Sequence, residues 1–199
     1  MQLVLVRHAL PERVQDSDGP ADPPLTALGR KQADRLVDAL GADVTALYAS
    51  PLARARATAA PLAAALGRDP EIVPDLREFD SDATHYVPVH EMALVDPAAW
   101  ARMRAGLLPA HVDVPAFTAR VDGALERIVA AHPGRATVVV VAHAGVVNGW
   151  LAHLLGLDRP LVFPLDYAGI TRVLAGRDGR RLVRSVNETA HVADLLTTD

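Results

Sequence analysis

The hydrophobic positions of the chain alternate between short apolar runs and longer amphipathic segments. The runs at residues 2–6, 45–49 and 136–142 are typical of buried parallel strands. Two further β-rich segments, 169–175 and 181–187, flank a Gly-Arg-Asp-Gly turn and predict a hairpin. Strands separated by helical segments predict a three-layer α/β/α sandwich with a mostly parallel central sheet.

Four of the intervening segments carry apolar residues at helical spacing. Thr26 is expected to cap a helix that ends at Gly41, with Leu28, Leu36, Val37 and Leu40 on its buried side. Ser50-Pro51 are expected to be the N-cap and the first residue of a second helix. Two more helices are predicted at about 117–131, ending before Pro133-Gly134, and from Gly145 onwards.

The stretch from about 79 to 116 interrupts this alternation. It contains four prolines, and its only convincing helix is short, at about 97–106. We interpret it as an excursion from the sheet, with two readings: a cover over a ligand site, or a surface crossover without substrate contact. Its candidate substrate contacts are His85, Tyr86, His90, Trp100, Arg102 and Arg104. Repeats and low-complexity linkers are absent from the sequence, which predicts one domain over residues 1–199.

Polar residues stand where two of the predicted strands end. Arg7-His8 closes the first strand, His143 follows strand 136–142, and Arg54 lies in the first turn after the second strand. Ligands of open α/β sheets bind beyond the carboxyl ends of the strands. Helix N-termini there would direct free amide groups and positive dipole ends into the same space. Each residue alone is ambiguous, but together they predict a phosphate-binding pocket.

Composition removes several function classes. The formal net charge of −4 gives no global basic field, so neither nucleic acid nor an anionic membrane is an expected partner. Without cysteine the chain can form neither a thiolate zinc site nor a cysteine nucleophile. The N-terminus has no secretion signal and no apolar run is long enough to span a membrane, so we expect a cytoplasmic protein.

Several segments together resemble one enzyme family. Leu5-Val6-Arg7-His8-Ala9 resembles the Arg-His-Gly signature of the histidine phosphatases, the phosphoglycerate-mutase-like superfamily. Residues 24–33 resemble its Leu-Thr-x-x-Gly-x-x-Gln-Ala helix start, and residues 49–59 its Ser-x-x-x-Arg-Ala-x-x-Thr-Ala segment. Residues 141–145 are similar to its second histidine motif, and 187–192 to its closing Asn-x-x-x-His-Leu. The matches occur in the family's order along the chain.

The resemblance implies a role for each matched residue. His8 would attack phosphorus and become phosphohistidine, and the phosphoryl oxygens would be bound by Arg7, Arg54, His143 and Ala144. Arginine and imidazole groups suit this work, because the transferring group spreads negative charge over its oxygens. The resemblance implies no metal and no cofactor. Chemistry of this kind requires one nitrogen of His8 to be held as a donor, and the sequence does not show what holds it.

A leaving alkoxide also needs a proton. The resemblance implies Glu78 as the acid, since Leu76-Arg77-Glu78 fits the family's Leu-x-Glu context after a third short strand. Asp75, Asp80 and Asp82 are the alternatives, and a simple ion pair with an arginine is the other reading of Glu78.

Three departures from the family pattern bear on the substrate. Ala9 replaces the usual glycine, which predicts a slightly shifted loop. Val14 stands where many members have an asparagine that binds phosphate, with Gln15 as its candidate substitute. The residues after Glu78 lack the usual glycine.

Rival enzyme classes fit less well. The sequence His90-Glu91-Met92-Ala93-Leu94 lacks the second histidine of a zinc-protease helix. Serine-hydrolase and P-loop motifs are also absent from the sequence. We therefore expect a metal-independent phosphomonoester hydrolase that acts on a small phosphorylated metabolite. A mutase-like phosphotransferase and a noncatalytic phosphate-binding module stay open, as does the oligomeric state, for which a homodimer is one candidate.

Overall fold

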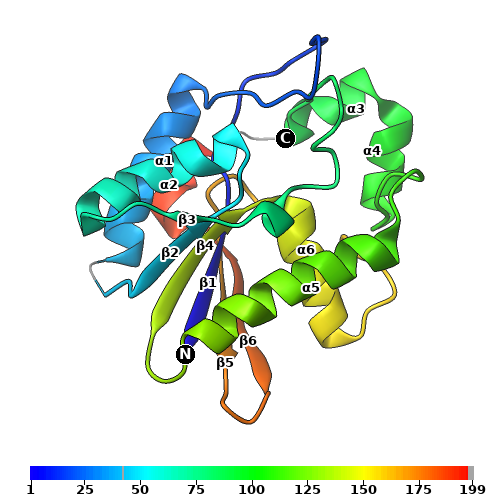
Figure 1. Cartoon of the computed structure of the whole chain (residues 1–199). Helices are drawn as coiled ribbons and strands as arrows, with labels where there is room; N and C mark the ends of the chain where they lie inside the picture. Colours follow the sequence, from blue (N-terminus) through cyan, green and yellow to red (C-terminus); the bar gives the residue numbers. More distant parts are fainter. Residues whose placement is uncertain (42, 197–199) are drawn as a thin grey trace.

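The computed structural model describes residues 1–41 and 43–196, and in them six strands form one sheet in the order β3-β2-β4-β1-β5-β6. The strands are β1 (Gln2–Arg7), β2 (Ala46–Ala49), β3 (Glu71–Ile72), β4 (Thr137–Ala142), β5 (Ile170–Ala175) and β6 (Arg181–Glu188). The pairs β1/β4, β2/β4 and β2/β3 are parallel, whereas β1/β5 and β5/β6 are antiparallel. The predicted mostly parallel sheet is therefore confirmed, with the predicted hairpin at one edge (Figure 1).

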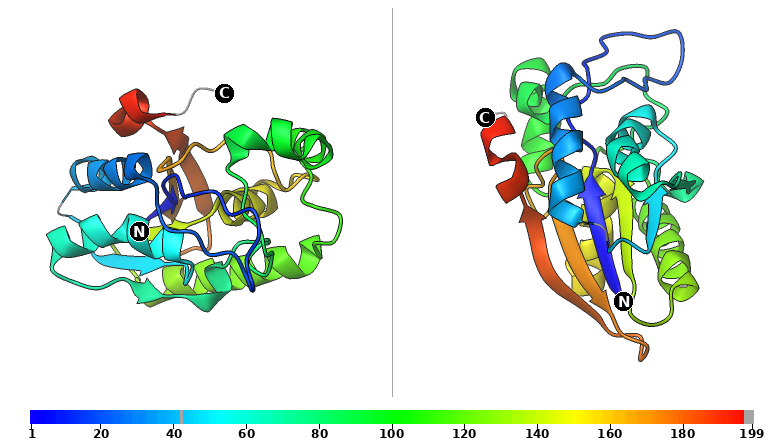
Figure 2. Two further views of the ribbon diagram at one scale, coloured as in Figure 1. Left: turned by 90° about the horizontal axis from the view of Figure 1, so that it is seen from above. Right: turned by 90° about the vertical axis from the view of Figure 1, so that its left-hand side faces the viewer.

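Helices cover both faces of this sheet. They are α1 (Ala27–Leu40), α2 (Ala53–Leu66), α3 (Met92–Val95), α4 (Pro97–Arg104), α5 (Val114–Ala131) and α6 (Ala144–Leu155). Short 3-10 helices occupy Pro74–Leu76, Val89–Glu91 and Ala190–Leu195. Figure 2 shows α1 in front of the strands and α6 behind them in its right-hand view. The predicted α/β/α sandwich is confirmed.

The central strands are buried on both sides because both faces are covered. Side chains of a strand alternate between faces, so one set packs against α5 and α6 and the other against α1 and α2. The first set includes Leu3, Leu5, Val138 and Val140, and the second includes Val4, Val6, Val139 and Val141. This burial fixes the register that places Arg7 opposite Ala142 at the carboxyl ends of β1 and β4.

Helix α1 anchors the loop that follows His8. Its predicted cap is confirmed, because the Thr26 hydroxyl accepts a hydrogen bond from the Gly29 N–H at 2.8 Å. Its buried side consists of Gly29, Gln32, Ala33 and Leu36, whereas the expected Leu28, Val37 and Leu40 are only half-buried. The loop crosses the helix so closely that a Cβ on Gly29 would collide with the Leu10 carbonyl. Gln32 accepts a hydrogen bond from the Leu10 N–H at 3.0 Å.

Two boundaries differ from the sequence prediction. Helix α2 begins at Ala53 with Leu52 as its N-cap, so the expectation that Ser50-Pro51 start this helix is wrong. Helix α5 begins at Val114, inside the expected excursion, because Asp113 caps it through the Ala116 N–H at 3.0 Å. Gly179, with φ of 83°, forms the predicted hairpin turn.

The excursion lies at the end of the sheet where the parallel strands finish. It contains α4, as expected, and also α3, which the sequence pattern did not indicate. Figure 1 shows α3 and α4 at the same end of the molecule as the loop that follows β1. Every helix within the described residues is too short or too polar to cross a bilayer.

Candidate active site

Two buried histidines face each other at the carboxyl ends of neighbouring strands. His8 follows β1 and His143 follows β4, and their ring centroids are 5.1 Å apart. Both are buried, with 3% and 0% of their surface exposed. The backbone brings them together, since the His8 N–H donates to the Ala142 carbonyl at 2.8 Å. The sequence prediction that both histidines open onto one edge is confirmed by these contacts.

His8 is oriented by its own backbone. Its Nδ1 lies 2.8 Å from the Ala9 carbonyl oxygen, an acceptor, so Nδ1 carries the proton and Nε2 keeps a lone pair. Burial, followed by the charges of Arg54 and Arg7, lowers the pKa of His8 well below its usual value. The ring is therefore neutral at pH 7. The Ala9 carbonyl is thus the acceptor that holds Nδ1 as a donor, which the sequence did not reveal.

Arg7 is held against the loop that precedes β5. Its Nη1 donates to the Leu165 carbonyl, and its guanidinium stacks 3.8 Å from the centroid of the Tyr167 ring. Its Nε is buried and has no hydrogen-bond partner among the described residues. Burial of an unpaired donor is costly, so this nitrogen is suited to an anion.

Residues 187–192, which resemble the closing motif of the family, support the loop that precedes β5. Asn187 accepts a hydrogen bond from the Asp166 N–H at 2.8 Å and donates to the Asp166 carboxylate at 2.7 Å. His191 Nε2 lies 3.1 Å from the Ala168 carbonyl oxygen. Ala168 adopts a positive φ of 57° and donates its N–H to the Arg7 carbonyl at 3.1 Å. The tail therefore acts on the site through the loop that binds Arg7.

Arg54 enters the same space from α2. It is 1% exposed, and its Nη2 donates to Asp80 at 3.3 Å. Asp22 lies 3.8 Å from Nη1, an ion-pair distance. Neither Nε nor Nη1 of Arg54 has a hydrogen-bond partner in the part of the chain that the structure describes. Two donors of this arginine are therefore available to an anion.

The expectation of free amides at two helix N-termini needs correction. At α2, both carboxylate oxygens of Asp22 accept hydrogen bonds from the Ala53 N–H, at 2.8 and 2.9 Å. At α6, the Gly145 N–H donates to Glu78 at 2.7 Å. Carboxylates take these positions because helix N-termini attract negative charge. Ala144 is the first residue of α6, where the helix itself leaves the backbone N–H without a partner.

His143 is fixed by a residue that sequence reasoning assigned elsewhere. Its Nε2 lies 2.7 Å from the Ser50 hydroxyl oxygen, and its buried Nδ1 lacks a partner among the described residues. Burial, followed by the charge of Arg54, lowers the pKa of His143 well below its usual value. A neutral ring whose Nε2 accepts from Ser50 has its proton on Nδ1. It can then donate into the site.

Glu78 is buried beside the start of α6. Its two carboxylate oxygens accept hydrogen bonds from the N–H groups of Gly145 and Phe79, at 2.7 and 3.1 Å. Burial, followed by the charge of Asp80, raises the pKa of Glu78 to about 7. A carboxyl group with this pKa can both donate and accept a proton at cellular pH. The alternative Asp80 is engaged with Arg54, Asp82 is exposed, and Asp75 pairs with Arg127.

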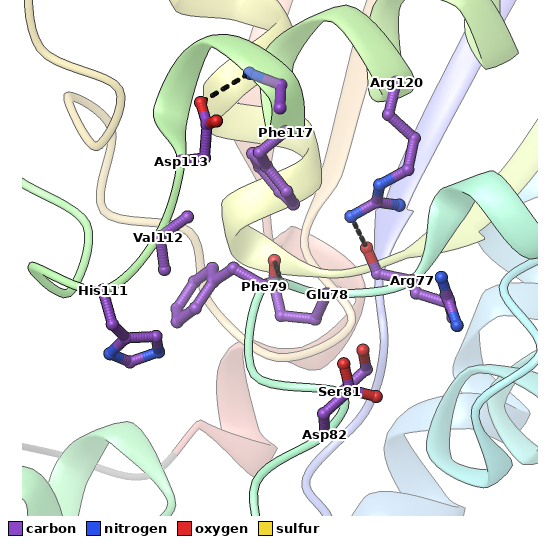
Figure 3. Close-up of a pocket in the computed structure, with 11 residues that line it drawn as sticks. Arg77, Glu78, Phe79, Ser81, Asp82, His111, Val112, Asp113, Phe117 and Arg120 are labelled. Carbon is purple, nitrogen blue, oxygen red and sulfur yellow. Dashed lines mark hydrogen bonds between the residues drawn. The ribbon is translucent and has the colours of Figure 1, made fainter.

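A pocket of about 370 Å³ opens next to Glu78 (Figure 3). The Phe79 and Phe117 rings form part of its wall, with centroids 6.2 Å apart. Arg77 and Arg120 lie at one end in the figure and His111 at the other. Arg120 also fixes the segment before Glu78, because it donates to the backbone carbonyls of Asp75 and, at 3.0 Å, Arg77. The remaining lining residues are Ser81, Asp82, Val112, Asp113 and Ala116.

The excursion residues that the sequence suggested as substrate contacts differ in burial and in their contacts. Tyr86 is buried, and its ring centroid lies 4.8 Å from the Arg54 guanidinium. Arg102 donates to the Leu108 carbonyl and so holds the excursion together. On α4, Trp100 is half-buried and Arg104 is exposed.

Two histidines of the excursion and Gln15 lie outside the buried cluster of arginines and histidines. His85 is exposed, and His90 is partly buried with Nε2 at 3.8 Å from Glu91. The substitute considered for the missing asparagine, Gln15, is exposed. Val14 instead pairs its backbone with Tyr86.

Sequence comparison identifies the family. The model of the histidine phosphatase superfamily (branch 1) matches residues 3–188. The chain belongs to this superfamily. Within the described residues, no group of three or more His, Cys, Asp and Glu side chains is arranged to hold a metal ion.

The curated relatives are longer proteins. The chain is 28% identical to the bifunctional protein Rv2228c of Mycobacterium tuberculosis over 200 residues, which cover 96% of this chain and 55% of that protein. It is 31% identical to the PE-PGRS family protein PE_PGRS11 of the same species, over 79% of this chain and 31% of that protein. This chain therefore spans 31% of the length of one relative and 55% of the other.

Solved structures of the superfamily share the fold. A mycobacterial glucosyl-3-phosphoglycerate phosphatase is 25% identical, with a TM-score of 0.78 over 95% of this chain and 99% of that one. YhfR of Bacillus stearothermophilus is 25% identical, with a TM-score of 0.76 over 96% and 98%. A phosphoserine phosphatase of Entamoeba histolytica is 22% identical, with a TM-score of 0.75 over 96% and 98%. The last similarity concerns the fold alone.

Proposed function

We propose that the protein is a metal-independent phosphomonoester hydrolase that uses His8 as its nucleophile. One observation carries the proposal: the two arginines whose charges act on His8, and the histidine beside it, have buried donor nitrogens without partners. They are Arg7 Nε, Arg54 Nε and Nη1, and His143 Nδ1, and the absence of partners refers to the described residues. An oxyanion with several oxygens would satisfy all of them at once. Two arginines beside a neutral imidazole suit a transferring phosphoryl group in particular.

The first chemical step transfers the phosphoryl group to the enzyme. The Nε2 lone pair of His8 attacks phosphorus while the bond between phosphorus and the ester oxygen breaks. Glu78, protonated, gives its proton to the departing oxygen, so an alcohol leaves. Arg7, Arg54 and His143 bind the phosphoryl oxygens, where the charge is spread.

The second step returns the enzyme to its starting state. Water attacks phosphorus, Glu78 as a carboxylate accepts a proton from that water, and the bond between phosphorus and Nε2 breaks. Inorganic phosphate leaves, the electron pair returns to Nε2, and Glu78 is again protonated. Its pKa of about 7 suits a group that alternates between acid and base.

The pocket beside Glu78 supports a small phosphorylated metabolite as the substrate. A proton donor must touch the leaving oxygen, so the rest of the leaving group extends from Glu78 into the space that this residue lines. A volume of about 370 Å³ is in the range of small-molecule sites. Arginines at one end and Asp82 and Asp113 elsewhere on the wall favour a polar leaving group. The leaving group therefore lies beside α5, and not beside Trp100, Arg102 and Arg104, the candidate substrate contacts on α4.

The test is a screen of phosphorylated metabolites combined with trapping of the phosphoenzyme. We expect release of inorganic phosphate, and a phosphoryl group on His8 that is labile in acid and stable in alkali. His8→Ala should lose both, while the matched variant His153→Ala, on the exposed side of α6, should keep them. Phosphate on a serine or aspartate, or full activity of His8→Ala, would refute the proposal. Re-transfer of phosphate to a second metabolite in place of release would identify a mutase.

A further inference from the structure

Tyr86 belongs to the excursion, yet it is built into the arginine cluster. The residue is 8% exposed, and its ring lies over the Arg54 guanidinium at 4.8 Å. Its backbone pairs in both directions with Val14, through hydrogen bonds of 3.0 and 2.8 Å. The excursion and the loop after β1 thus hold this ring in place from two sides.

A second tyrosine lies over the other arginine. Tyr167 is 3% exposed, and the Arg7 guanidinium stacks at 3.8 Å from its ring centroid. The His8 ring centroid lies 5.8 Å from that of Tyr167. The Tyr167 hydroxyl accepts a hydrogen bond from the Val89 N–H at 3.1 Å. Because Val89 follows Tyr86 closely in the sequence, Tyr167 ties the Tyr86 segment to Arg7.

The hydroxyl of Tyr86 adds a hydrogen-bonding group to the ring that stacks on Arg54. A phenylalanine would stack on Arg54 equally well, so the tyrosine adds a hydroxyl group to a ring that already lies over the arginine. Burial is the largest cause that raises the pKa of Tyr86 well above its usual value. The hydroxyl therefore keeps its proton at any physiological pH, and a protonated hydroxyl can donate a hydrogen bond.

We propose that the Tyr86 hydroxyl donates a hydrogen bond to a phosphoryl oxygen held by Arg7 and Arg54. In this arrangement Tyr167 is a positioning residue for Arg7 and for the segment that carries Tyr86. This inference rests on the proposed phosphate site. Arg7, Arg54 and His143 approach the phosphoryl group from the strand ends and α2, and Tyr86 approaches it from the excursion. On this proposal the excursion is part of the phosphate site, which favours the first of the two readings of residues 79–116.

The test is the affinity for inorganic phosphate and for vanadate, measured by calorimetry without turnover. Tyr86→Phe keeps the ring over Arg54 and the backbone pairing with Val14, and removes only the donor. A hydrogen bond to a charged group is worth enough that both affinities should fall by about 10- to 100-fold. The unfolding temperature should stay at the wild-type value. Tyr48→Phe is the matched control, because it removes a partly buried hydroxyl that contacts His132 at 2.9 Å, and its phosphate affinity should be unchanged.

The positioning role of Tyr167 has its own readout. Tyr167→Phe keeps the stack on Arg7 and removes the acceptor of the Val89 N–H, so phosphate affinity should fall less than in Tyr86→Phe. If Tyr167 acts through the Tyr86 segment, the double variant should lose less than the two single losses combined. Strict additivity would refute this coupling.

The outcomes separate this inference from the proposed function. Wild-type protein that binds phosphate and vanadate, together with a Tyr86→Phe variant that binds them equally well, would overturn the role of Tyr86 and leave the phosphatase intact. A wild-type protein that binds neither anion would overturn the proposed function, and this inference with it.

Discussion

The hydroxyl of Ser50 lies 2.7 Å from Nε2 of His143, and both residues are completely buried. Ser50 follows β2 and His143 follows β4, so the contact joins the ends of two adjacent parallel strands. A serine hydroxyl can donate to Nε2, which places the imidazole proton on Nδ1. With Ser50 as the donor, the contact leaves the buried Nδ1 of His143 as the donor nitrogen of the ring.

Ser50→Ala is predicted to weaken phosphate binding without disrupting the fold. The variant removes the partner that fixes the His143 tautomer, and the ring can then turn its acceptor nitrogen toward the substrate. Loss of one neutral hydrogen bond corresponds to a fall in kcat/KM of about 3- to 10-fold. Steady-state kinetics and thermal unfolding would be measured together. A variant with wild-type kinetics would show that Ser50 does not orient His143.

Gly145→Ala is predicted to disturb proton transfer more than phosphate binding. A Cβ at this position would collide with the Glu78 carboxylate and lie 2.7 Å from the Phe79 ring. Glu78 must therefore move, and alkyl phosphates, which need a proton on the leaving oxygen, should suffer most. The ratio of alkyl to aryl phosphate turnover should fall by about 10- to 100-fold. An equal loss for both substrate types would indicate general damage to the site.

Removal of metal ions is predicted to leave the rate unchanged. The positive charge beside His8 comes from the guanidinium groups of Arg7 and Arg54. Turnover would be compared before and after extensive chelation, and vanadate, which adopts a five-coordinate geometry like that of the transition state, should inhibit. An apoenzyme that needs zinc or magnesium to recover would favour a metal-dependent mechanism.

Arg77→Ser is predicted to change the choice of substrate and not the binding of phosphate. Arg77 is exposed, lines the pocket beside Glu78, and is not one of the buried unpaired donors of the described residues. For a polar substrate that contacts it, KM should rise by about two- to fivefold. Affinity for inorganic phosphate should match the wild type. A parallel loss of phosphate affinity would place Arg77 in the phosphoryl site instead.

The fold could be predicted from the sequence because the apolar runs and the polar residues that follow them indicate the same sheet. The strands β1 and β4 are continuous apolar runs, and each is followed by a histidine, so the sheet edge and two site residues came from the same pattern. The start of α2 could not be read, because Ser50-Pro51 has the local chemistry of a helix start. Tertiary contact with His143 engages the serine, and the helix begins later, at Ala53.

The parts of the site that escaped prediction depend on contacts between distant segments. Tyr167 lies in an irregular stretch before β5, and only the folded chain places it against Arg7. Likewise, nothing in the local sequence indicates that Asp22 would occupy the N-terminus of α2. Glu78 was recognisable from its family-like context, but its raised pKa arises from burial and from Asp80, which a sequence does not display.

The pH dependence of Glu78 provides the sharpest test of its role. Because its pKa is raised to about 7, the residue is protonated below this pH and is a carboxylate above it. Phosphoryl transfer from an alkyl phosphate to His8 needs the protonated form, so its single-turnover rate should fall as pH rises through about 7. Hydrolysis of the phosphoenzyme needs the carboxylate and should rise over the same interval. Glu78→Gln should remove both dependences and lower turnover of alkyl substrates by about 10²- to 10⁴-fold.

Aryl phosphates and neighbouring acids complete this test. With p-nitrophenyl phosphate the leaving group needs little protonation, so Glu78→Gln should form the phosphoenzyme readily and hydrolyse it slowly, and phospho-His8 should accumulate. Asp80→Asn removes the nearby negative charge that raises the pKa of Glu78, so the alkyl profile should shift to lower pH. Asp82→Asn, at an exposed position, serves as the matched control. If Glu78→Gln slows alkyl and aryl substrates equally and no phosphoenzyme builds up, the proton comes from another group, and Asp80 becomes the first candidate.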